Sequence, residues 1–170
     1  MERESRTTDA MLRERARHWP QAEAPAAQAI VRLFRFHKLV LANAAENVAR
    51  HGLSFTEFEV LASLRGAPPP HVLSPTALYD ALLISSGGLT KTLYGMTARG
   101  LVSRSADATD GRVKPVRLTR KGRALIERAM ADVLESDRTR MLAGLSAAEL
   151  ATFIRLLRKL LAAVEGDGAA

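Results

Sequence analysis

The sequence of 170 residues contains no cysteine, and this absence removes several kinds of chemistry. Disulfide crosslinks, thiolate metal sites and thiol-based redox sensing are all excluded. Aromatic residues make up only 5%, so a core must be built mostly from leucine, alanine and valine. No apolar run approaches the ~20 residues that cross a bilayer, and the acidic Glu2, Glu4 and Asp9 are unlike a signal peptide. We therefore expect a cytoplasmic protein without a membrane partner.

The sequence also lacks the short motifs that carry most enzymatic chemistry. It has no phosphate-binding glycine loop, no nucleophile elbow and no helix with the His-Glu spacing of a metalloprotease. The four histidines show no metal-ligand spacing: His18, His37, His51 and His71. We expect neither an enzyme nor a cofactor or metal site.

Positive charge is concentrated in one segment of the chain. The net charge is +7, and residues 74–123 contain nine lysines and arginines against three acidic residues. The remaining segments are close to neutral. A localised basic surface is typical of proteins that bind a polyanion such as DNA. A solvated basic face without function is the alternative, but a DNA-binding motif coincides with this one.

The basic segment has the layout of a helix-turn-helix followed by a β-hairpin wing. A Ser-Pro pair opens a helix over 74–83, because the serine caps it and proline in the first turn loses no needed N–H. Residues 85–99 predict a second helix, which a glycine ends. Residues 101–105 and 113–118 predict two strands around an Asp-Gly turn.

The rest of the chain predicts helices. Ser54 and Glu57 have the spacing of a capping box, as do Ser146 and Glu149. The wide apolar stripe of the last helix needs a partner surface, which is either the core or another subunit. We expect a mainly α fold with a small antiparallel β wing, a winged helix-turn-helix with long terminal helices. The further helices are expected at residues 8–19, 26–51, 54–66, 119–143 and 146–165.

The second helix of the basic segment is expected to enter the major groove. If Leu89, Leu93 and Met96 face inward, the residues on the outward face are Ser86, Thr90, Lys91 and Tyr94. Gly87 and Gly88 cost about 1 kcal/mol each relative to alanine inside a helix. Either a close approach to DNA or a frayed first turn explains them.

The expected wing tip is charged. Arg112 can reach the minor groove, where an arginine is electrostatically favoured, and Asp110 can orient the tip. Lys114 adds to the basic arms. An ordinary charged hairpin turn is the alternative interpretation.

These motifs resemble those of the MarR family of bacterial transcriptional regulators, over about residues 26–165. The resemblance is carried by the Ser-Pro-opened helix, the recognition helix, Gly100-Leu101-Val102, Asp110-Gly111-Arg112 and Leu118-Thr119-Arg120-Lys121-Gly122. It implies a homodimer on a double-stranded, pseudo-palindromic DNA operator, usually as a repressor that a small aromatic or anionic ligand releases. It also implies a division of the chain: an extension with a short helix (1–25), dimerisation helices (26–53 and 120–165), the winged helix-turn-helix (54–119) and a tail (166–170).

A finer resemblance is to the urate-responsive branch of that family, which has an additional N-terminal helix ending in a tryptophan. Trp19 matches that position, Glu59 an acidic residue of the second core helix, and Arg104 an arginine of the first wing strand. Thr92 stands where the branch has another arginine. The resemblance therefore implies a ligand pocket of Trp19, Glu59, Arg104 and, more weakly, Thr92, with urate itself disfavoured.

The residue chemistry leaves alternatives open. Trp19 could anchor its helix to the core, and Glu59 could form a salt bridge on the outer face of its helix. A winged-helix regulator without a small-molecule effector is the second functional hypothesis. A protein-binding winged helix that has lost DNA binding is disfavoured, because it has no need of Lys91 and Arg112.

The wing hypothesis predicts the behaviour of one variant. Arg112→Ala is expected to weaken operator binding at moderate salt, because a cation leaves a region of strongly negative potential. Gel-shift titration measures this, and an unchanged affinity would show that the wing does not read DNA.

Overall fold

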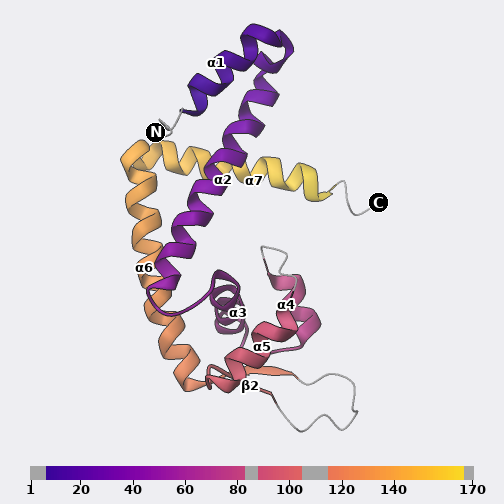
Figure 1. The fold of residues 1–170 in the computed structure, drawn as a ribbon, viewed down its shortest axis with the longest axis vertical. Helices are drawn as coiled ribbons and strands as arrows, with labels where there is room; N and C mark the ends of the chain where they lie inside the picture. The colour runs from indigo at the N-terminus through magenta and orange to yellow at the C-terminus, as the bar shows by residue number, and fades with distance from the viewer. Residues whose placement is uncertain (1–6, 83–87, 105–114, 167–170) are drawn as a thin grey trace, which may run out of the picture.

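The computed structural model describes residues 7–82, 88–104 and 115–166 (Figure 1). Within them the chain is mainly α, with one small antiparallel sheet, as predicted. The helices are α1 (Thr8–His18), a 3₁₀ turn η1 (Pro20–Glu23), α2 (Pro25–Ala49), α3 (Phe55–Gly66), α4 (Pro75–Ala81), α5 (Leu89–Ala98), α6 (Arg120–Gly144) and α7 (Ala147–Gly166). The strands are β1 (Val72–Leu73), β2 (Val102–Arg104) and β3 (Val116–Leu118).

Figure 1 shows two regions joined by long helices. Helices α2 and α6 pack against each other, and α3, α4, α5 and the sheet gather at one end of this pair. At the other end α1 folds back along α2, and α7 turns away from the end of α6. The segment predicted to read DNA therefore lies far from the turn between α1 and α2.

Side-chain caps fix where most helices begin. The predicted capping box at Ser54 forms, because its hydroxyl accepts from the backbone N–H of Glu57 at 3.2 Å and the Glu57 carboxylate accepts from Ser54 N–H at 2.9 Å. The second predicted box forms at Ser146, where hydrogen bonds from the serine lower the pKa of Glu149. Ser74 caps α4, again as predicted, and Thr119 caps α6.

The sheet has one strand more than the sequence predicted. Its order is β1-β3-β2, and both pairs are antiparallel, with Val72 opposite Arg117 and Val102 opposite Leu118. β1 has two residues, too few to show the alternation by which a strand is recognised in sequence. Its pairing with β3 ties the approach to α4 to the base of the wing.

One continuous core lies among α3, α5, the sheet and α6. One face of α3 enters this core, since Leu61 and Leu64 are fully buried and Phe58 nearly so. Leu93 and Met96 of α5 meet this core, as does Ile126 of α6. Each fully buried side chain of this size contributes about 1.5–3 kcal/mol, so this core stabilises the winged region (residues 54–119) together with α6.

The start of α5 differs from the prediction. The helix begins at Leu89 instead of Ser85, because Gly88 precedes it with φ +102°, in the left-handed region. Glycine adopts this conformation without the strain that a Cβ brings. Gly88 is therefore a helix-entry residue and carries no helix-interior cost, while Gly87 and Ser85 lie outside the described residues.

A second glycine sets how closely α6 approaches the α5–β2 turn. A Cβ on Gly122 would overlap the carbonyl oxygen of Leu101. The Thr119 hydroxyl lies 2.9 Å from that oxygen and accepts from Gly122 N–H at 3.0 Å. The first turn of α6 therefore contacts the backbone of the turn between α5 and β2 directly.

The terminal helices leave a large apolar surface uncovered. No residue of α7 is buried, and five of its large apolar side chains are exposed: Ile154, Leu156, Leu160, Leu161 and Val164. Val48 near the end of α2 is fully buried, but Ile30 and Phe34 near its start are 49% and 71% exposed. Across the described residues, no helix has the length and apolar character that crossing a bilayer requires. Exposed apolar area of this extent marks a protein interface.

The uncovered stripe predicts a dimer that one charge can break. Leu160→Glu is expected to shift the protein toward monomer, because a carboxylate would be buried without a partner. Ala162→Glu is the matched control, since Ala162 lies on the polar arc of α7 with Arg155 and Arg158. Light scattering at micromolar concentration should give twice the chain mass for the native protein and the control; a native monomer would contradict the dimer.

Candidate DNA-reading surface and adjoining cavity

Helix α5 exposes one polar face because its other face is locked in the core. Leu93 and Met96 are 1% and 0% exposed, and Leu89 packs against the same core from the first turn. With this face fixed, Thr90, Lys91 and Tyr94 are exposed, and Tyr94 is 64% exposed. A hydroxyl, an ammonium and a phenol along one short helix can meet phosphates and base edges.

The structure places three of the seven predicted DNA contacts. Thr90, Lys91 and Tyr94 share the outward face of α5, as the sequence predicted. Four other predicted contacts lie outside the described residues: Ser86, Asp110, Arg112 and Lys114. The bases of the wing strands are described, and Arg117 is exposed on β3.

Arg104 lies against the recognition helix. Its guanidinium carbon is 4.8 Å from the centroid of the Tyr94 ring, a cation–π arrangement that holds the ring from the side of β2. Its Nε is buried without a hydrogen-bond partner within the described structure. A residue predicted to bind ligand therefore contacts a residue predicted to bind DNA.

Arg99, at the end of α5, connects the recognition helix to the α2–α3 junction. Its guanidinium donates to the carbonyl of Gly52 at 2.7 Å and to the Glu57 carboxylate at 2.9 Å. Lys121 of α6 donates to the backbone carbonyl of Arg99 at 2.8 Å. The C-terminal end of α5 is thus attached by hydrogen bonds to the α2–α3 turn, to α3 and to α6.

A cavity of about 660 Å³ lies where α3 and the end of α4 meet the long helices α2 and α6. Phe55 and Phe58 of α3 form an aromatic wall, with ring centroids 6.0 Å apart. Glu59, 7% exposed, is one of its acidic groups, and Asp137 of α6 is another. Cavities of this size and apolar character hold small molecules in many proteins. Its further lining residues are His37, Val40, Leu41, Ala44, Ala62, Ser63, Ala81, Met130 and Val133.

The four predicted ligand residues do not meet in this cavity. Glu59 lines it and is buried, so Glu59 does not lie on the outer face of its helix. Thr92 and Arg104 are half-buried in the winged region and do not line the cavity. Trp19 is 59% exposed just after α1, so the core-anchor alternative also fails within one chain.

Sequence reasoning missed Arg99 and the aromatic wall. Arg99 appeared as one of many cations in a basic segment, and nothing in its spacing marks a contact with Gly52, 47 positions away. Phe55 follows a helix cap, so the sequence indicates that it lies in the first turn of a helix. Nothing in the sequence indicates that its ring faces a cavity. Within the described residues no group of three His, Asp or Glu side chains could hold a metal ion.

The comparisons with known proteins agree with this architecture. A profile described as MarR family matches residues 51–113. A MarR family protein of Mycobacterium tuberculosis, solved in complex with salicylic acid, is 31% identical over 81% of this chain and 97% of its own, with a TM-score of 0.62. The chain belongs to the MarR family. Members of this family are transcriptional regulators and not enzymes, and they function as dimers.

Two further MarR family structures are similar. BpsR of Bordetella bronchiseptica, whose DNA binding is regulated by 6-hydroxynicotinic acid, is 28% identical and covers 78% of this chain and 98% of its own, with a TM-score of 0.66. A variant of MarR from E. coli is 28% identical over 76% of this chain and 94% of its own, also with a TM-score of 0.66. The similarity extends over nearly the full length of these relatives.

The exposed polar face of α5 predicts how the DNA affinity of this MarR family chain depends on salt concentration. Lys91→Ala is expected to weaken DNA binding and to reduce the slope of log K against log salt by about 2 for a dimer, because each of the two subunits loses one phosphate contact. Lys159→Ala on the polar arc of α7 is the control and should leave the slope unchanged. Fluorescence anisotropy across salt concentrations measures both; an unchanged slope for Lys91→Ala would remove α5 as the contact.

Proposed function

We propose that this chain is a sequence-specific DNA-binding regulator, a homodimeric repressor of a pseudo-palindromic operator that a small aromatic or anionic ligand releases. The observation that carries the proposal is the two-sided α5, with Leu93 and Met96 buried and Thr90, Lys91 and Tyr94 exposed. Membership of the MarR family and the net charge of the segment support it. The uncovered apolar face of α7 supports the homodimer.

The effector site we propose is the cavity behind Phe55 and Phe58. It lies where α3 meets α2 and α6, so a ligand there would contact both the winged region and the long helices. An aromatic ring fits between phenylalanine walls by offset or edge packing. Relatives solved or studied with salicylic acid and 6-hydroxynicotinic acid support an aromatic effector.

We also propose that this chain is related to the urate-responsive branch of the family, but without urate as its ligand. Helix α1, followed by Trp19, supports the additional N-terminal helix. Because Thr92 can hydrogen-bond but cannot hold an anion as arginine does, we do not propose urate as the ligand.

The effector hypothesis predicts a ligand response that one substitution removes. Salicylate and 6-hydroxynicotinate serve as probes, since a ligand of the folded state raises its Tm by mass action. We expect a positive probe to raise Tm and to release operator DNA in a gel shift. Ala81→Phe should abolish both effects, because Ala81 lines the cavity from the end of α4 and is exposed enough to accept a larger side chain.

Thr76→Phe is the matched control on the same helix, since Thr76 is exposed and does not line the cavity. The comparison requires that the two variants bind the operator with equal affinity in the absence of ligand. A ligand response that persists in Ala81→Phe would place the effector elsewhere. Operator binding that no aromatic probe alters would favour the regulator without an effector.

A further inference from the structure

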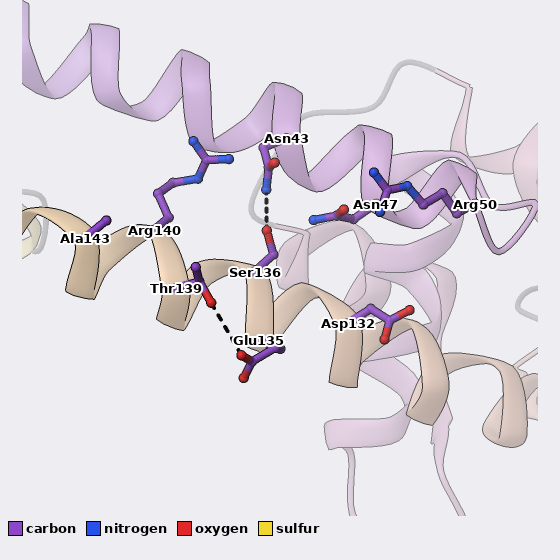
Figure 2. A pocket seen from close by; sticks show the side chains of 9 residues that line it. All are labelled: Asn43, Asn47, Arg50, Asp132, Glu135, Ser136, Thr139, Arg140 and Ala143. Atoms are coloured by element: carbon purple, nitrogen blue, oxygen red, sulfur yellow. Dashed lines mark hydrogen bonds between the residues drawn. The ribbon is translucent and has the colours of Figure 1, made fainter.

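A second cavity lies between α2 and α6, and its chemistry differs from that of the proposed effector site. Its volume is about 760 Å³, and eight of its nine lining residues are polar: Asn43, Asn47, Arg50, Asp132, Glu135, Ser136, Thr139 and Arg140, with Ala143. Figure 2 shows these side chains along the gap between the two helices, with one direct hydrogen bond across it, from Asn43 to Ser136 at 2.9 Å.

Asn47 is the buried member of this group. It is 8% exposed, and its Nδ2 finds no hydrogen-bond partner in the described part of the chain. An amide nitrogen left without an acceptor costs about 1–3 kcal/mol. Because Asn47 lines the cavity, an acceptor oxygen of a bound molecule would satisfy it.

The two acidic groups of the cavity are already engaged. The Asp132 carboxylate lies 2.8 Å from Nε2 of His51. Glu135 accepts from Arg138 at 2.6 and 2.9 Å, and these hydrogen bonds lower its pKa. Each carboxylate therefore contacts a partner other than the two arginines of the cavity.

Arg50 and Arg140 are the cations of the cavity. Within the described residues neither guanidinium lies within salt-bridge distance of a carboxylate. In Figure 2, Arg140 lies on one side of Asn43 and Asn47, and Arg50 lies on the other. Two separated guanidinium forks and a buried amide N–H form a set of donors that matches oxygens of more than one anionic group.

We propose that this cavity binds a small organic polycarboxylate, with Arg50 and Arg140 on its terminal carboxylates and Asn47 on a central oxygen. The site is separate from the effector cavity, because the two share no lining residue. They also lie on different faces of α6: residues 130, 133 and 137 line one, and residues 132, 136, 139 and 143 the other. A ligand here would join α2 to α6 at the point where Asn43 and Ser136 already meet, and the proposal does not depend on DNA binding.

The experiment titrates citrate into the full-length protein by isothermal calorimetry, in a phosphate-free buffer at constant ionic strength. Acetate is the monovalent control, and inorganic phosphate separates a carboxylate site from a general oxyanion site. We expect saturable citrate binding with a raised Tm, and no saturable binding of acetate or phosphate. Arg50→Gln and Arg140→Gln should each weaken citrate binding at least about tenfold, because each loses a charge-assisted contact.

Arg128→Gln is the matched control, since Arg128 is exposed on α6 and does not line the cavity. Asn47→Asp places a negative charge at the buried position and should abolish binding; circular dichroism checks its fold, and the two arginine variants stand if it fails to fold. The proposal is overturned if citrate binds no better than acetate, if phosphate binds equally well, or if Arg128→Gln weakens binding as much as Arg140→Gln. It is also overturned if the arginine variants dissociate the dimer without changing citrate binding, because the arginines would then face a second copy.

Discussion

The burial of one face of α5 is the constraint on which the reading surface depends. The helix has 10 residues, and a helix shorter than ~12–15 residues is marginal in water by itself. Its stability must therefore come from Leu93 and Met96, which enter the core formed by α3, the sheet and α6. Once these two side chains are inside, the 3.6-residue period leaves Thr90, Lys91 and Tyr94 outside. The packing that buries the apolar face of α5 therefore also leaves its polar face exposed to solvent.

The recognition helix is also held at its C-terminal end by polar contacts. Arg99 reaches Gly52 and Glu57, and Lys121 reaches the Arg99 carbonyl, while Gly122 lets α6 meet the turn after α5. Because these contacts come from the α2–α3 turn, α3 and α6, the orientation of α5 depends on how α3 and α6 lie. The proposed effector cavity is lined by α3 and α6, together with α2. A ligand that changes their packing has a physical path to the DNA-reading face.

The two ends of the molecule are stabilised differently. The winged region has a buried core within one chain, whereas α7 and the start of α2 keep large apolar side chains exposed. A MarR family dimer resolves this contrast, because a second copy can cover what one chain leaves open. In such a dimer the separation of two α5 helices would be set by α2, α6 and α7 and not by the winged regions themselves.

Much of the fold was predictable because its signals are local. Capping boxes at Ser54 and Ser146, the Ser74 cap and the inward leucines of α3 and α5 depend on neighbours within four residues along the chain. The two-residue β1 and the later start of α5 were not predictable, because the first exists only through pairing with β3 and the second through the conformation of Gly88. The prediction of the ligand-binding residues was less accurate: Glu59 lines the proposed effector cavity, whereas Trp19 and Arg104 do not.

The sequence by itself determined the class of protein, the starts of the helices that a serine caps and the polar face that α5 presents, since charge and periodicity are carried by the residues in order. Only the tertiary structure decided which side chains share a cavity. Arg104 against Tyr94, Arg99 against Gly52 and Asn47 between Arg50 and Arg140 bring together residues from different elements. Such contacts depend on how helices and strands pack in space, and no local pattern records that packing.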